Sequence, residues 1–179
     1  MKRYSKLIPQ GTRDLLFEEC DDRRDVEAIL SALFKEHKYR KVMTPTVEFY
    51  DVFAENDLGI EAEEMYKLSD SQGRTTVLRP DNTAPIARLV ATRLSKEDFP
   101  VRLYYKNVYV RNKSLAGRTD ETEQSGIELI GDGSIDADIE VISMAYEALK
   151  RNNVSSFKLE LCHAGFFKSI LNKMNITST

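Results

Sequence analysis

The chain has 179 residues, of which 41% are hydrophobic and 31% are charged, and its 26 basic and 29 acidic side chains give a formal net charge of −3. This balance is typical of a folded globular protein and excludes a disordered or fibrous one. The pI near 5.6 argues against broad binding to nucleic acid or to anionic membranes, because both require clustered positive charge.

Membrane and targeting signals are missing from the sequence. No apolar run approaches the roughly 20 residues that span a bilayer, and no apolar stretch of signal length follows the basic N-terminus. Cys20 and Cys162 fit neither a metal-ligand spacing nor a disulfide framework. Because repeats and linkers are also missing, we expect one cytoplasmic domain over residues 1–179.

The N-terminal elements begin with a long helix that is expected to end at about Lys38. Apolar residues recur on one helical face at Val26, Ile29, Leu30, Leu33 and Phe34. Residues 39–48 are typical of a strand that Pro45 interrupts, since proline lacks a backbone donor and belongs at an edge or bulge. A short helix is expected near residues 50–56.

A β-hairpin is predicted next. Residues 65–69 and 74–78 flank Asp70-Ser71-Gln72-Gly73, in which Asp and Gly tolerate the positive φ of a tight turn. Asn82-Thr83 then precede Ala84-Pro85, which indicates the start of a helix reaching about Leu94.

The rest of the chain predicts two long strands and further helices. The strands cover residues 102–111 and 122–130, and a helix from about 135 to 151 carries Ile139, Ile142, Tyr146 and Leu149 on one face. A strand at 157–162 and a helix at 166–173 follow. Hairpin-connected strands with helices between them predict an α+β fold, with an antiparallel-dominated sheet flanked by helices.

The strand at 122–130 offers the most informative side chains. Gln124, Gly126 and Glu128 share one face, while the opposite face is apolar and fits a core. Glutamine and glutamate can accept hydrogen bonds from an ammonium or an imidazole, and glycine lets a ligand approach the backbone. A solvated strand face with a glycine bulge is the alternative.

Two other segments can likewise be interpreted either as structural or as ligand-binding. Asp81 and Thr83 precede a helix, where they can cap it or grip an α-amino group. Arg111 and Arg118 bracket a polar loop that is either a solvated hairpin tip or a clamp for a carboxylate or phosphate.

Few residues in the sequence have the spacing of a metal site. Residues 132–143 have the spacing of a calcium loop, but Ala137 and Ser143 stand where the turn glycine and the bidentate glutamate are needed. His37 and His163 have no second ligand at a suitable spacing. We expect a helix cap at the first segment, and no metal or other cofactor.

Read together, the segments resemble the catalytic core of class II aminoacyl-tRNA synthetases, and the histidyl-tRNA synthetase type in particular. The matching pieces are the opening Gly11-Thr12-Arg13-Asp14, the dimer-forming first motif at 39–48, the amino-acid motif "LRPEGT" at Leu78-Arg79-Pro80-Asp81-Asn82-Thr83, and the second motif at 102–131 with Gln124-x-Gly126-x-Glu128-x-x-Gly131.

The sequence also departs from the synthetases. Two residues after Arg111 those enzymes have a glutamate that contacts adenine, whereas this chain has Lys113. Asp81 replaces the motif's glutamate, the loop is shorter by one residue, and no third-motif arginine is present. With these departures the chain resembles the regulatory-subunit branch of ATP phosphoribosyltransferase. It is expected to cover roughly the N-terminal half of a member of that branch.

This resemblance implies a non-catalytic subunit that assembles with a short catalytic ATP phosphoribosyltransferase, forms a homodimer and senses L-histidine as its effector. In that branch Asp81 and Thr83 hold the α-amino group with Gln124 beside them, Glu128 faces the imidazole or ammonium, and Arg111 faces the carboxylate. Arg118 is a further candidate for the carboxylate. A truncated histidyl-tRNA synthetase, a nucleic-acid-binding relic and a binder of another amino acid are the alternatives; the acidic balance argues against the second.

Overall fold

The structure is a computed structural model that describes residues 6–54, 59–111 and 119–162, together with Gly165, Ser169 and Lys173. The helices are α1 (Glu18–Glu36), α2 (Asp51–Ala54), α3 (Thr83–Arg93) and α4 (Ile135–Arg151), with a 3-10 turn, η1, at Ala62–Glu64. The strands are β1 (Arg40–Lys41), β2 (Val47–Phe49), β3 (Lys67–Ser69), β4 (Thr75–Leu78), β5 (Val101–Val110) and β6 (Glu121–Ile130).

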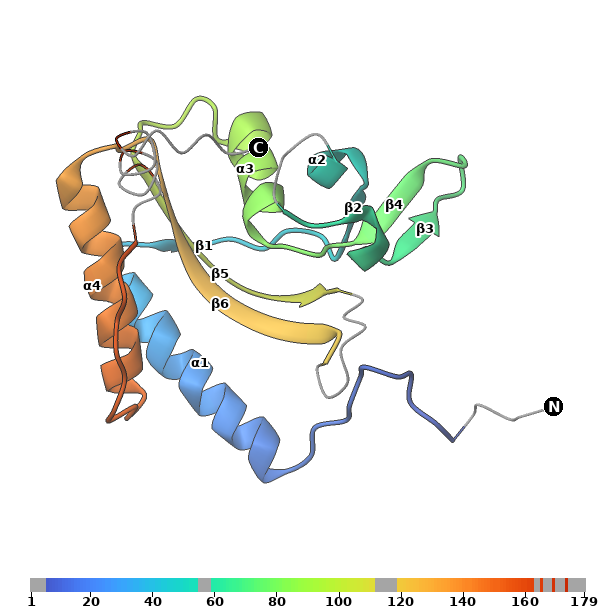
Figure 1. Ribbon diagram of the computed structural model, residues 1–179, viewed down its shortest axis with the longest axis horizontal. Coiled ribbons are helices and arrows are strands. Elements are labelled where there is room, and N and C mark those ends of the chain that lie inside the picture. Colours follow the sequence, from blue (N-terminus) through green and yellow to red (C-terminus); the bar gives the residue numbers. More distant parts are fainter. Residues whose placement is uncertain are drawn as a thin grey trace.

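The strands form two three-stranded sheets rather than the single sheet that the sequence predicts. The larger sheet has the order β1-β5-β6, with β1 parallel and β6 antiparallel to β5. The smaller has the order β2-β4-β3 and is antiparallel throughout. Figure 1 shows β5 and β6 as a long twisted ribbon, with α1 and α4 side by side on one face and α3 on the other. The antiparallel-dominated α+β architecture is confirmed.

Strand β5 buries side chains on both of its faces. The core beneath α1 and α4 contains Leu33, Phe34, Tyr39, Tyr104 and Met144. The core beneath α3 contains Ile86, Val90, Val101, Leu103 and Tyr105, and a third cluster under the small sheet contains Phe53, Met65, Val77 and Ala84. Alternation along β5 therefore holds helices on both faces of the larger sheet.

Arg79, just after β4, joins the two sheets. Its buried guanidinium donates to the carbonyl oxygens of Val108 at 2.6 Å, Thr44 at 2.7 Å and Pro45 at 3.0 Å. The first carbonyl belongs to β5 and the other two lie in the connection between β1 and β2. The break predicted at Pro45 is thus present, and its carbonyl is bound by Arg79.

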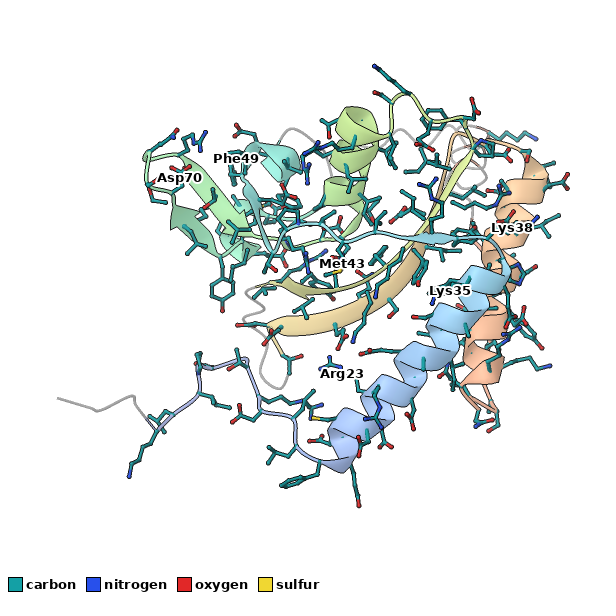
Figure 2. All side chains as sticks on the ribbon, turned by 180° about the vertical axis from the view of Figure 1, so that it is seen from behind. Arg23, Lys35, Lys38, Met43, Phe49 and Asp70 are labelled. Carbon is teal, nitrogen blue, oxygen red and sulfur yellow. The ribbon has the colours of Figure 1, made fainter. Side chains whose placement is uncertain are left out.

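The predicted β-hairpin is also confirmed. The Oδ1 of Asp70 accepts hydrogen bonds from the backbone N–H groups of Gln72 and Arg74, and Gly73 has a φ of 77°. Figure 2 places Asp70 at the tip of this hairpin, well away from the larger sheet.

Helix α4 has the predicted bounds, but the apolar face that the sequence indicates is not its buried face. Ile139, Tyr146 and Leu149 are 55%, 46% and 37% exposed, whereas Ala137 and Met144 are buried. Met144 belongs to the core that contains Leu33 and Phe34 of α1, whereas the ring of Tyr146 lies 5.3 Å from that of Phe157. No helix among the described residues is long and apolar enough to cross a membrane.

The strand predicted at 157–162 is wrong: these residues form neither helix nor strand. Phe157, Leu159 and Leu161 alternate as strand residues do, but none of the described strands pairs with them, and Leu161 is 70% exposed. Most of the helix predicted at 166–173 lies outside the described residues, as do residues 55 and 56 of the short helix.

Candidate functional site

The candidate site lies where the N-terminus of α3 meets one face of β5 and β6. In the strand register Leu103 is opposite Glu128, Tyr105 opposite Gly126, and Asn107 opposite Gln124. All six residues therefore belong to the sheet face that α3 covers. This register brings the predicted strand face and the predicted helix start together.

Asp81 caps helix α3. Its Oδ2 accepts hydrogen bonds from the backbone N–H groups of Thr83 at 2.8 Å and Ala84 at 3.0 Å. A carboxylate at this position also interacts favourably with the positive end of the helix dipole. The capping role is thus present, while Oδ1 makes no hydrogen bond among the described residues.

Thr83 connects the helix to the strand. Its hydroxyl donates to Oε1 of Glu128 at 2.9 Å. Three of the predicted site residues, Asp81, Thr83 and Glu128, are therefore gathered in one place although 45 positions separate the last two.

The site has an excess of negative charge. Burial raises the pKa of Glu128 and the nearby Asp81 raises it further, while the hydrogen bond from Thr83 acts in the opposite direction. Neither carboxylate forms an ion pair among the described residues. Two acids without a basic partner favour a ligand that brings positive charge.

Tyr105 is a member of the site that sequence reasoning missed. It is 4% exposed, and its pKa is raised to about 12 by burial and by the charges of Glu128 and Asp81. A Cβ atom on Gly126 would lie 2.6 Å from the Tyr105 hydroxyl oxygen. Gly126 therefore makes room for this ring rather than for a ligand, which corrects the sequence interpretation. A glycine opposite an aromatic residue on the neighbouring strand would have indicated this contact, but that pair is known only once the β5–β6 register is known.

Gln124 lies at the rim of the site with its side chain exposed. Its Oε1 accepts a hydrogen bond of 2.8 Å from Nδ2 of Asn82, which is fully buried at the start of α3. Asn82 is a second residue of the site that the sequence indicated only as part of a helix start.

Arg111 reaches the segment that carries Asp81. Its Nε donates to the carbonyl oxygen of Pro80 at 2.6 Å, and its guanidinium lies 5.3 Å from the centre of the Tyr109 ring. This anchoring places a cation next to the motif without pairing it to either site carboxylate. Arg118, the further candidate, lies outside the described residues.

The possible calcium segment is a helix cap, as expected. Ser134 Oγ accepts from the Ala137 N–H at 3.2 Å, and Asp132 Oδ1 accepts from the Ser134 N–H at 3.0 Å. In the described part of the chain, no group of three or more His, Cys, Asp or Glu side chains is arranged to hold a metal ion.

A family model described as histidyl-tRNA synthetase matches residues 11–179. The chain belongs to the histidyl-tRNA synthetase family. Among curated relatives in this family, it is 44% identical over 177 residues to an ATP phosphoribosyltransferase regulatory subunit of Clostridium novyi, covering 98% of this chain and 42% of that protein. It is 45% identical to a protein of the same name from Clostridium acetobutylicum, over 96% of this chain and 42% of the relative. The chain thus spans less than half the length of these relatives.

Solved structures of the histidyl-tRNA synthetase family give the same result. The chain matches an ATP phosphoribosyltransferase regulatory subunit/histidyl-tRNA synthetase from Bacillus halodurans with a TM-score of 0.89 and 38% identity, over 97% of this chain and 45% of the other. It matches apo histidyl-tRNA synthetase of S. aureus with a TM-score of 0.68 and 30% identity, over 80% of this chain and 34% of the other. The class II synthetase-like fold and the resemblance to the regulatory-subunit branch are confirmed.

Proposed function

We propose that this chain is the N-terminal part of a regulatory subunit of ATP phosphoribosyltransferase in histidine biosynthesis, and that it binds L-histidine as a feedback signal. The curated relatives at 44% and 45% identity carry that name. The observation that carries the ligand proposal is the pair of carboxylates, Asp81 and Glu128, which share one site without a basic partner among the described residues.

Histidine matches the charges of this site. Its α-ammonium group fits between Asp81 and Thr83, and its imidazole N–H fits against Glu128, because each donor then meets an acceptor. The carboxylate of the ligand faces Arg111, which Pro80 already holds beside the motif. Both charges of the zwitterion are thereby paired, which a buried ligand requires.

The chain acts through assembly rather than chemistry. Lys113 stands where a synthetase has the glutamate that contacts adenine, so ATP is not held for adenylation. The proposed partners are a short catalytic ATP phosphoribosyltransferase subunit in the cytoplasm and a second copy of this chain, and no cofactor is required.

The test is calorimetric titration of L-histidine into the wild type, Glu128→Ala and Glu121→Ala. Removing one acid leaves a donor of the ligand without its charged partner at a cost of about 2–5 kcal/mol, so Glu128→Ala weakens binding by about thirtyfold or more. Glu121 is an exposed residue of β6 outside the site, and its variant retains wild-type affinity.

Equal affinities for the wild type and Glu128→Ala would remove Glu128 from the site. A second measurement distinguishes the alternative of a truncated histidyl-tRNA synthetase. On the full-length gene product, histidine-dependent exchange of labelled pyrophosphate into ATP stays at background for a regulatory subunit, and exchange above background would establish adenylation instead.

A further inference from the structure

Asn82 occupies an unusual place behind the site. It stands at the position of glycine in the synthetase motif that this segment resembles, and its side chain is 0% exposed. The Nδ2 group donates to Oε1 of Gln124, which comes from β6, 42 positions along the chain. A buried amide from the start of α3 thus holds a rim residue of the strand.

This hydrogen bond decides which end of the Gln124 amide is left for a ligand. A glutamine side chain has one oxygen that accepts and one nitrogen with two donors. The oxygen is occupied by Asn82, while Nε2 makes no hydrogen bond among the described residues. We propose that Asn82 is a positioning residue that turns the N–H donors of Gln124 toward the ligand, so that the site recognises a carboxylate. The proposal rests on the amino-acid site of the proposed function.

The reverse arrangement of the two amides is less favourable. It would leave Nδ2 of Asn82 buried without an acceptor among the described residues. In the observed arrangement the unpartnered group of Asn82 is Oδ1 instead. Buried carbonyl oxygens without full pairing are tolerated better than orphaned N–H groups, which favours the observed direction.

The charges of the site favour the same direction. Burial is the larger cause of the raised pKa values of Glu128 and Tyr105, and the charge of Asp81 raises both further, so the two carboxylates add negative potential at this end of the sheet. An amide presents its positive end to such a field. Because Asn82 occupies its oxygen, Gln124 complements Arg111 as a donor to the carboxylate and does not add a third acceptor for the ammonium group beside Asp81 and Thr83.

Two readouts on the full chain test this role. The first needs no ligand: NMR on the free protein shows slowed exchange of the Asn82 Nδ2 protons and a nuclear Overhauser contact between them and the Gln124 side chain. Rapid exchange without that contact would overturn the proposal, whether or not histidine binds.

The second readout compares L-histidine with histamine, which lacks the carboxylate. Asn82→Ala weakens histidine binding by about three- to tenfold, the loss that corresponds to one oriented hydrogen bond. Histamine affinity changes by less than about twofold, since that ligand does not use the Gln124 donors. In a Gln124→Ala background, Asn82→Ala has no further effect.

The possible failures are distinguishable. If the wild type binds neither ligand, the proposed histidine site is wrong, and the NMR measurement still decides the role of Asn82. If Asn82→Ala weakens histidine and histamine equally, Asn82 acts only on the fold and the positioning role is overturned.

Discussion

Glu128 is a partly buried carboxylate whose charged form is unfavourable when no ligand is bound. Burial raises its pKa above the ordinary value, and Asp81 adds to the effect. An acid with a raised folded-state pKa contributes its full stability below the unfolded pKa and loses that contribution as the pH rises through the folded pKa. At neutral pH Glu128 therefore destabilises the ligand-free site, and a cationic ligand removes the penalty.

We predict that Glu128→Gln raises the melting temperature of the ligand-free protein at pH 7. Glutamine keeps an acceptor for the Thr83 hydroxyl but carries no charge to bury. The gain is about 2–4 °C for each kcal/mol of relief, and it shrinks toward zero as the pH approaches about 4, where an unperturbed glutamate takes up its proton.

Thermal melts between pH 4.5 and 7 measure this gain. Glu121→Gln is the matched control in the same strand, because Glu121 is exposed and forms no ion pair among the described residues, and its effect stays small at every pH. A gain for Glu128→Gln that is the same at every pH would show that charge burial is not its cause.

Part of the site is predictable from single residues. Asp81 and Thr83 follow from the signature of a helix start, and Glu128 follows from the alternation along β6. Tyr105 and Asn82 do not, because their roles depend on the β5–β6 register and on the docking of α3 against it. Which residue faces Gly126 is a property of two strands together.

At the level of elements, one side chain connects the two sheets. Arg79 binds carbonyl oxygens on β5 and in the β1–β2 connection, and its backbone N–H donates to the Thr46 carbonyl at 2.9 Å. Burial lowers the pKa of Arg79, and the charge of Glu48 partly offsets this effect. The planar guanidinium presents several donors in a fixed geometry, which a lysine ammonium does not reproduce.

We predict that Arg79→Lys destabilises the protein although the charge is retained. Each hydrogen bond to the charged group that is lost costs about 1.5–3 kcal/mol, and the carbonyl oxygens left behind add to the loss. Urea unfolding measures the effect. Arg93→Lys, in the exposed last turn of α3, is the control and changes stability by less than about 0.5 kcal/mol. Equal midpoints for both variants would contradict a connecting role for Arg79.

The elements themselves are largely predictable from sequence. The bounds of α4 are as expected, and β5 and β6 each begin within one residue of the expected position. Two failures have physical causes. Residues 157–162 have a strand pattern without a pairing strand among the described residues, and periodicity alone did not show which apolar side of α4 packs against α1. Both depend on contacts between distant segments.

For the molecule as a whole, the small sheet leaves one apolar face open. The register places Phe49, Thr76 and Leu68 on the same side, with Val47 two positions along β2. Val47, Phe49 and Leu68 are 45%, 43% and 45% exposed, and Met43 in the preceding connection is 71% exposed. Figure 2 shows Met43 and Phe49 along this β1–β2 segment. Several exposed apolar side chains on neighbouring segments are typical of an interaction site.

We predict that the chain forms a two-fold dimer through this surface, which includes part of the dimer-forming motif expected at residues 39–48. Val47→Asp places a charge on the face of β2 that points away from Glu48 and the core, so the fold is retained while self-association weakens by about tenfold or more. Ile139→Asp is the control, because Ile139 is also apolar and is 55% exposed but lies on α4. Light scattering across a concentration series gives twice the 20.5 kDa chain mass for the wild type and for Ile139→Asp, and a shift toward the single-chain mass for Val47→Asp. A wild type that remains monomeric at the highest concentration, or a Val47→Asp variant as dimeric as the wild type, would place the interface elsewhere or exclude it.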